Sequence, residues 1–184
     1  MQLQIKNIVE SKRGYGMARI SSITVQYVNE SNFKDLGQLI KVPDDKSKKP
    51  DFESEILTFY GGLGLINSDL PIELGICRFK KREMVIEQFE CHSRTQELLY
   101  AIDDDFVMPV APNLTRKDGD IPDLEKAMAI RVRRGEGVIF ERGVWHSVPY
   151  PFKDESFALV VFTKNTAKND LKIFNLKEKI RMVE

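Results

Sequence analysis

The sequence predicts an all-β domain, an antiparallel sandwich or jelly-roll barrel with one or two short helices. Apolar and polar residues alternate in 83–92, as they do in a half-buried strand, and 156–163 form a short apolar run. Turn residues recur at close intervals, including "DDD" at 103–105 and "RGEG" at 134–137. Many short strands at close spacing favour an all-β fold over alternating βαβ units.

Seven segments have the composition of strands and are separated by Gly, Pro or Asp. They lie at 75–79, 83–92, 97–102, 106–111, 128–133, 137–140 and 156–163. Side chains repeat every second residue along a strand, so Glu90 and His92 share one face of 83–92. Val85 and Phe89 share the other face of that strand.

Helix is expected at only two places. Residues 30–40 can begin a short helix with Ser31 or Asn32 as its N-cap. In 174–183 the apolar residues are spaced by four and three, which places them on one helical face: Leu176, Ile180 and Val183.

The composition is that of one soluble globular domain: 184 residues, of which 42% are hydrophobic and 30% charged. We expect the barrel domain to span 24–184. Residues 1–23 are expected to form an extra strand with a turn at 13–16, and a long loop is expected at 41–55.

Several classes of protein are excluded by charge and cysteine usage. The 28 basic residues balance the 28 acidic ones, and no basic stripe marks a nucleic-acid binder. No apolar run reaches the roughly 18–20 residues of a membrane span, and the N-terminus lacks the apolar stretch of a secretory signal. Cys77 and Cys91 are too few and too far apart for a disulfide scaffold or a Cys-x-x-Cys zinc site. We predict a cytoplasmic protein with no nucleic-acid or membrane partner.

The chain has two histidines, and one lies in the cluster "ERGVWHSVPY". This region resembles the second motif of the cupin superfamily: glycine, five residues, proline, any residue, glycine, two residues, histidine, three residues, asparagine. Gly135, Gly143 and His146 match that motif. Glu141 replaces the proline, and Tyr150 replaces the asparagine.

The other histidine lies in "ECHSRTQE", which resembles the first cupin motif, His-x-His followed after three or four residues by Glu. Glu90 stands in place of the first histidine and His92 is the second. Gln96 follows after three residues and Glu97 after four. Glu90 and His92 then point into one barrel, the turn adds Gln96 or Glu97, and a later hairpin supplies His146. Imidazole with carboxylate or amide oxygen suits Ni, Mn, Fe or Zn, with an open position for substrate.

Each candidate also has a structural interpretation. A histidine in a strand is often a hydrogen-bonded core residue, and Glu90 can pair with Lys or Arg because a buried carboxylate needs a partner. Trp145 can pack in the core or stack on a ligand. Tyr100 is a further candidate to line a substrate pocket.

Among the cupins, the chain resembles the ureidoglycolate lyase family. The resemblance rests on "ECH" followed by "TQ" and on "RGVWH" at 142–146. It extends to "NFKDLGQLI" at 32–40 and "GICRF" at 75–79, and it spans about 24–184. Ser147 departs from the family, which often has a second histidine there.

The resemblance implies a cupin-type barrel, a homodimer, and release of urea from ureidoglycolate to leave glyoxylate, a step of purine catabolism by allantoin degradation. This elimination needs a cation for the substrate carboxylate, for which Arg78 is the first candidate and Arg142 the second. His92 or Glu90 is the candidate base for the hydroxyl proton, and His146 is the candidate acid for the departing nitrogen.

Two versions of the site stay open. In one, His92, His146 and either Gln96 or Glu97 hold a divalent metal, which stabilises the developing alkoxide. In the other the site is metal-free, since a histidine bound to a metal cannot also be the base. Two rival functions also stay open: a non-catalytic or regulatory cupin that binds a carboxylate or sugar, and a metal-dependent sugar or keto-acid isomerase, which Glu97 favours.

Overall fold

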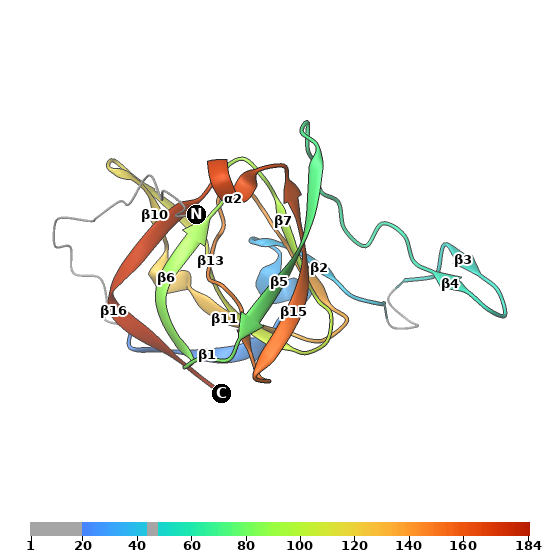
Figure 1. The fold of residues 1–184 in the computed structure, drawn as a ribbon, viewed down its shortest axis with the longest axis horizontal. Helices are drawn as coiled ribbons and strands as arrows, with labels where there is room; N and C mark the ends of the chain where they lie inside the picture. The colour runs from blue at the N-terminus through green and yellow to red at the C-terminus, as the bar shows by residue number, and fades with distance from the viewer. Residues whose placement is uncertain (1–19, 44–47) are drawn as a thin grey trace.

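The computed structural model describes residues 20–43 and 48–184, and most of its regular structure is β-sheet (Figure 1). The larger sheet has seven strands, in the order β11 (Met128–Val132), β1 (Ser22–Tyr27), β16 (Lys172–Val183), β6 (Val85–Cys91), β13 (Trp145–His146), β8 (Phe106–Ala111) and β14 (Tyr150–Pro151). Because β11 also pairs with β8, all of these strands except β14 close into a six-stranded barrel.

A second sheet lies beside the barrel, with β5 and β15 to the right of β6 and β16 in Figure 1. Its strand order is β2 (Gly37–Ile40), β12 (Gly137–Phe140), β7 (Glu97–Ala101), β15 (Glu155–Thr163) and β5 (Ile72–Lys80). Two short hairpins complete the β-structure: β3 (Phe52–Glu53) with β4 (Thr58–Phe59), and β9 (Asn113–Arg116) with β10 (Gly119–Pro122).

There are two apolar cores, one inside the barrel and one between the barrel and the five-stranded sheet. Successive side chains of a strand point to opposite faces, so one strand can contribute to both cores. Along β8, Val107 points into the barrel, whereas Phe106 and Met108 point out of it toward the five-stranded sheet. Along β13, Trp145 packs in the barrel core. Its neighbour His146 therefore faces the space between the sheets, which is where the candidate site lies. The prediction that the site residues point into one barrel is wrong in this respect, because on β6 and β13 the neighbouring residues Phe89 and Trp145 face the barrel core instead.

The prediction of an all-β barrel with one or two short helices is confirmed. All seven predicted strands are present, as β5, β6, β7, β8, β11, β12 and β15. Most neighbouring strands are antiparallel, but β1 runs parallel to both β11 and β16. Of the described residues, only short segments are helical: α1 (Glu30–Phe33), α2 (Thr166–Asn169) and the 3₁₀ turn η1 (Leu124–Lys126).

The helix predicted at 174–183 is wrong, because this segment is all of β16 except its first two residues. It pairs with β6 and β1, and Ile180 and Met182 alternate into the barrel core. The register slips between Asn175 and Ile180. This irregularity disturbs the strict alternation by which a strand is recognised.

The segment 30–40 is helical only in its first turn. Asn29, not Ser31 or Asn32, is the N-cap of α1, and its side chain accepts a hydrogen bond from the Asn32 amide. Strand β2 begins at Gly37, where a Cβ would lie 1.8 Å from the Ile139 carbonyl oxygen. Glycine is therefore required where β2 approaches β12.

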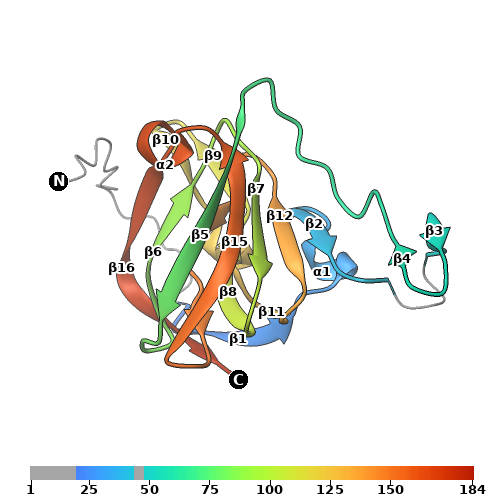
Figure 2. The same cartoon turned by 45° about the vertical axis from the view of Figure 1, so that its right-hand side comes forward.

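The expected boundary at 23/24 stays a prediction, because the turn at 13–16 and most of 1–23 lie outside the described residues. Within the described chain, β1 begins at Ser22 and already belongs to the barrel. The region expected to be a long loop at 41–55 leads into an arm that carries β3 and β4 away from the two sheets (Figure 2). None of the described helices has the length and apolar character needed to cross a bilayer.

Candidate active site

Two histidines and one glutamate meet between the sheets. The Glu97 Oε2 atom lies 3.2 Å from His92 Nε2 and 3.2 Å from His146 Nε2. One ligand atom from each residue lies within 4.8 Å of the other two, and all three side chains are buried. The two rings thus converge on one carboxylate, although they come from positions 54 residues apart in the chain (146 − 92).

Strand pairing explains this convergence. His146 pairs with Glu90 across β13 and β6, and Glu97 opens β7 opposite Phe140 of β12. The His146 ring stacks on Phe140 with a centroid distance of 4.8 Å and an interplanar angle of 7°. Both contacts leave His146 little freedom to turn away from Glu97.

The turn before His146 also fixes the end of β6. The Gly143 amide donates to the His92 carbonyl at 2.7 Å. Gly143 has a φ of +83°, in the left-handed region that glycine adopts without strain. The glycine shared with the cupin motif is therefore used to bring the two histidine-bearing segments together.

Glu90 lies at the edge of the cluster, with its Oε1 atom 3.7 Å from His146 Nε2. Burial is the main cause that raises the pKa of Glu90, and the neighbouring Glu97 raises it further, against the opposing effect of the histidines. A carboxyl group in such an environment is suited to take up and return a proton.

The charges of Glu97 and His92 stabilise one another. Burial, the largest single effect, would lower the pKa of His92, but Glu97, the Asp170 carbonyl and Glu90 together outweigh it and raise that pKa to about 9. Burial would likewise raise the pKa of Glu97, but the two histidines together lower it to about 2. Glu97 is therefore an anion held between two imidazoles.

Two atoms of this cluster are buried without a well-directed hydrogen bond among the described residues: Glu97 Oε2 and His146 Nε2. Leaving such a group unsatisfied costs about 1–3 kcal/mol. Both atoms face the same small volume, and two imidazole nitrogens with one carboxylate oxygen are a donor set for Mn, Fe, Ni or Zn. The residues present therefore fit a divalent metal.

Of the two residues predicted after His92, Glu97 joins the cluster and Gln96 does not. The Gln96 Oε1 atom accepts a hydrogen bond from the Asn67 amide at 2.7 Å, and its Nε2 donates to Glu141 Oε1 at 2.9 Å. Gln96 stands just before β7, and neither of these side-chain contacts is with a residue of the cluster. Gln96 therefore anchors a loop, and its prediction as a metal ligand needs correction.

The arginines predicted to bind the substrate carboxylate lie away from the cluster. Arg78 is exposed on the outer face of β5, opposite Phe79, and its Nε lies 2.7 Å from Glu155. Arg142 is exposed and donates from Nη2 to the Asn67 carbonyl at 2.9 Å. Both guanidinium groups have partners outside the cluster, and Arg78 also lines the cavity between β5 and β6, so carboxylate binding by either arginine stays a prediction.

The two predicted aromatic pocket residues also face away from the cluster. Tyr100 stands three residues after Glu97 on β7, so it lies on the other face, where its hydroxyl donates to the Gly135 carbonyl at 2.7 Å. Trp145 packs in the barrel core and donates from Nε1 to Asn113 Oδ1 at 2.9 Å. Trp145 is therefore a core residue, as its structural interpretation predicted. The prediction that Tyr100 and Trp145 contact the substrate needs correction.

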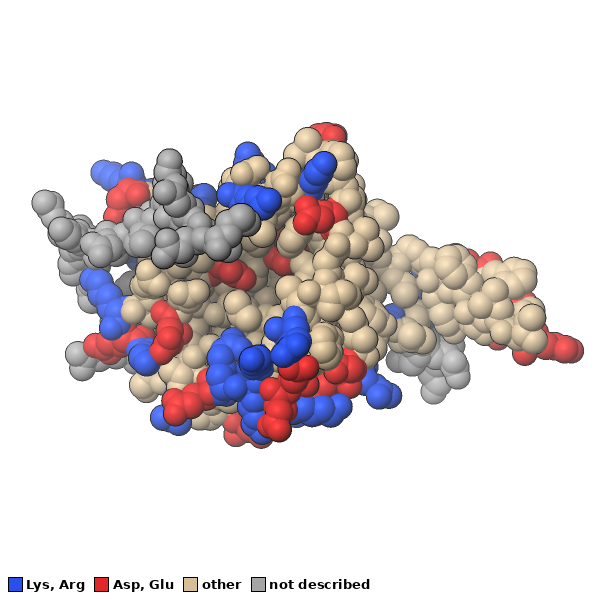
Figure 3. Space-filling model, in the orientation of Figure 1, with Lys and Arg blue, Asp and Glu red and all other residues tan. Residues whose placement is uncertain are grey.

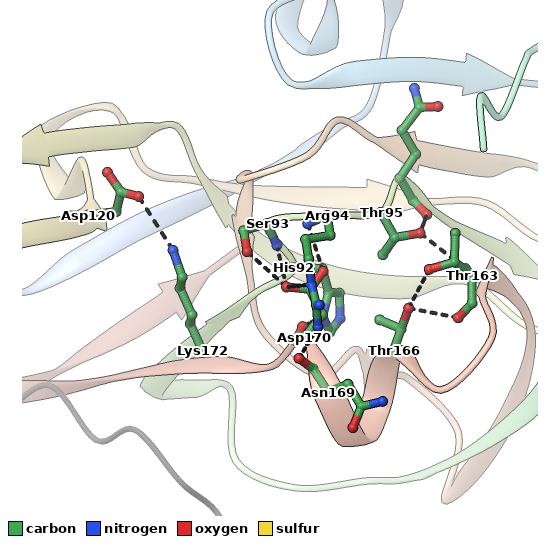
Figure 4. Close-up of polar contacts among 11 residues, drawn as sticks. His92, Ser93, Arg94, Thr95, Asp120, Thr163, Thr166, Asn169, Asp170 and Lys172 are labelled. Atoms are coloured by element: carbon green, nitrogen blue, oxygen red, sulfur yellow. Dashed lines mark hydrogen bonds and ion pairs between the residues drawn. The ribbon is translucent and has the colours of Figure 1, made fainter. Parts of the chain in front are cut away.

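Asp170 was not among the predicted site residues. Its backbone carbonyl lies 2.5 Å from His92 Nδ1, and its carboxylate binds the residues that follow His92 (Figure 4). Asp170 lies 78 residues from His92 along the chain, in a polar segment whose composition is that of an ordinary loop. No local sequence pattern marks such a contact.

A cavity of about 790 Å³ opens between β5 and β6. Its lining includes Arg78, Phe79, Gln88, Ser147 and Tyr150 but none of the cluster residues. It is nevertheless adjacent to them, because Gln88 precedes Glu90 by two residues and Ser147 follows His146. In the space-filling view this face is hollowed, with acidic atoms visible in the hollow (Figure 3).

The comparisons with known proteins identify a family. Residues 20–183 match the family model described as ureidoglycolate lyase. No curated protein matches the chain significantly. Among solved structures, an oxalate decarboxylase–formate complex from Lactobacillus farciminis is 15% identical with a TM-score of 0.37, and the match covers 57% of this chain and 26% of that one.

An oxalate decarboxylase from Bacillus subtilis at pH 4.6 is also 15% identical, with a TM-score of 0.35 and coverage of 57% and 23%. This chain thus spans about a quarter of the length of the solved proteins that it matches. The family match, in contrast, covers nearly the whole described chain, including both histidines and Glu97. The chain belongs to the ureidoglycolate lyase family.

Proposed function

We propose that this protein is a ureidoglycolate lyase, which releases urea from ureidoglycolate and leaves glyoxylate. The observation that carries the proposal is the buried cluster of His92, Glu97 and His146, with Glu90 at its edge, in a chain that belongs to this family. Incubation with ureidoglycolate tests it: urea and glyoxylate should appear together, faster than the substrate decays in buffer. Glu97 in the cluster also suits the isomerase alternative, and the family match is what favours the lyase over the alternatives.

The cluster residues act as a metal site in this proposal. His92, Glu97 and His146 would hold a divalent ion such as Ni, Mn, Fe or Zn through the atoms that converge between the sheets. When bound, such an ion supplies electrostatic stabilisation to an oxygen that develops negative charge. Because both histidines are then ligands, the proton transfers fall to a carboxyl group outside the cluster.

Glu90 is that group. As the carbon–nitrogen bond breaks, its carboxylate takes the proton of the substrate hydroxyl, whose oxygen becomes the carbonyl oxygen of glyoxylate. The electron pair of the broken bond stays on the nitrogen of the leaving urea, and Glu90 returns the proton to that nitrogen. No water is consumed and no atom is oxidised or reduced, so one carboxyl group can serve as base and then as acid.

We further propose a cytoplasmic homodimer. The arm exposes the apolar side chains of Phe52, Leu57 and Phe59, and Ile56 is 95% exposed. The outer face of the edge strand β5 is also apolar. The arm carries the acidic residues Glu53 and Glu55. Strand β5 ends at Lys80, and Lys81 follows it, so the two surfaces are complementary in charge as well as in apolar character. A second copy of the chain supplies both surfaces at once.

Replacing Ile56 and Phe59 together with serine should convert this dimer into a monomer. The two changes remove apolar area from the arm without touching either sheet. Light scattering after size-exclusion chromatography measures the mass. Ile102→Ser, which alters another exposed apolar side chain, should leave the dimer intact. A monomeric parent protein, or a dimer that survives the double change, would contradict the proposed interface.

A further inference from the structure

The loop that carries His92 is tied at one end to Asp170. The Asp170 Oδ1 atom accepts hydrogen bonds from the Ser93 amide at 3.0 Å and from the Ser93 hydroxyl at 2.8 Å. Its Oδ2 atom accepts a third from the Arg94 amide at 2.7 Å. Asp170 is buried, and it ends α2 just before β16 begins (Figure 4). Its carboxylate therefore joins two segments that are distant in the sequence.

The same residue also contacts the His92 ring, through its backbone. The His92 Nδ1 atom lies 2.5 Å from the Asp170 carbonyl oxygen. A carbonyl oxygen only accepts hydrogen bonds, so Nδ1 must carry the hydrogen. In the neutral ring this leaves the lone pair on Nε2, the atom that faces Glu97 and His146. The Asp170 carbonyl thus selects the tautomer in which His92 can bind a metal.

We propose that Asp170 is a positioning residue: its carboxylate holds the Ser93–Arg94 backbone so that its own carbonyl meets His92 Nδ1 and directs Nε2 into the cluster. The carboxylate and the carbonyl both belong to Asp170. Together they fix the position and the orientation of the His92 ring. The inference rests on the proposed function only in taking the cluster as the metal site.

The other end of this loop provides a matched control. Thr95 Oγ1 accepts a hydrogen bond from the Thr163 amide at 3.1 Å, and the Thr166 hydroxyl donates to the Thr163 carbonyl at 2.7 Å. Thr166 is also buried and begins α2, the helix that Asp170 ends, but it makes none of the contacts to His92 (Figure 4). Thr166→Val should therefore lower stability without turning the His92 ring.

The critical variant is Asp170→Asn, which keeps the size of the side chain. It removes the charge and places an amide NH₂ against backbone or hydroxyl donors that need an acceptor. Zn²⁺ affinity, measured by competition with a chromophoric chelator, should fall about 10–100-fold, as expected when the partner of a ligating histidine is disturbed. Thr166→Val should bind Zn²⁺ like the parent protein.

Nuclear magnetic resonance supplies a readout that does not depend on activity. The parent protein should show a slowly exchanging His92 Nδ1–H resonance, and a His146→Gln variant assigns it because the chain has only two histidines. This resonance should broaden or disappear in Asp170→Asn and persist in Thr166→Val. Ser93→Ala, which removes one of the three hydrogen bonds, should change both readouts in the same direction but less.

The proposal is overturned if Asp170→Asn keeps the Nδ1–H resonance and the Zn²⁺ affinity of the parent. It is also overturned if Thr166→Val loses both to the same degree, because the effect would then be general loosening of the loop. Should Asp170→Asn fail to fold, Ser93→Ala decides between these outcomes. Expected NMR and Zn²⁺ results in a protein that releases no urea would remove the proposed function and leave the role of Asp170 standing.

Discussion

Glu97→Gln should abolish metal binding by the cluster and lower kcat for ureidoglycolate by at least about 10²-fold. Mutation of a residue that only supports a metal ligand already lowers metal affinity or activity by about 10–100-fold, and Glu97 is a ligand itself. Glu97 Oε2 is the atom on which His92 and His146 converge, and glutamine keeps the shape but removes the negative charge. Metal content by inductively coupled plasma mass spectrometry and turnover by urea release measure the two effects.

The change should also reach His92. Its pKa is raised because Glu97 is an anion, so in the metal-free variant that pKa should fall below the value of about 9 in the parent protein. Glu125→Gln is the matched control, because Glu125 is exposed on η1, away from the cluster. A Glu97→Gln protein that keeps its metal and most of its turnover would remove Glu97 from the site.

Glu90→Gln should lower kcat by about 10²–10⁴-fold while metal content stays at the level of the parent protein. Glu90 is outside the set of converging ligand atoms, yet its Oε1 lies 3.7 Å from His146 Nε2. The amide of glutamine cannot take the hydroxyl proton or return it to the urea nitrogen. Steady-state kinetics with metal analysis of the same samples separates this effect from that of Glu97→Gln.

The same glutamine variant at position 125 again serves as control and should turn over substrate like the parent protein. If Glu90→Gln loses its metal as well, Glu90 is a ligand and not the proton carrier. If kcat changes less than about tenfold, the proton passes through another group, and the mechanism proposed here is wrong even if the reaction is correct.

Much of the fold could be predicted because strands show a period of two wherever one face meets a core. The seven predicted strands all have buried residues in the cores or between the sheets. Strand β16 was missed because its register slips between Asn175 and Ile180. The slip leaves Leu176, Ile180 and Val183 at spacings of four and three, which imitate a helix.

The site could be predicted as far as motif spacing reaches. His92 and His146 were predicted because their segments resemble two cupin motifs, and Glu97 because it follows His92 at the motif distance. The structure brings the three together, and their roles stay a prediction. Tyr100 and Trp145 were misplaced although the alternation of side chains along a strand argues against both. Tyr100 is three residues from Glu97 and Trp145 is next to His146, so each faces away from the cluster.

Long-range contacts were beyond prediction. Asp170 meets His92 only because α2 ends beside the turn between β6 and β7, and this depends on how the two sheets are packed. The surroundings of Arg78 were equally beyond prediction. Its strand is at the edge of the second sheet, where the arginine turns outward and pairs with Glu155 of β15.

The reaction itself is tested most directly with ureidoglycolate labelled with ¹³C at its urea carbon, followed by NMR. A lyase breaks the bond between carbon and nitrogen without water, so the label should appear in intact urea, with one glyoxylate for each urea and no ammonia. The rate should exceed that in buffer and that of Glu90→Gln. Label in bicarbonate together with free ammonia, or a rate no faster than the buffer, would contradict the account.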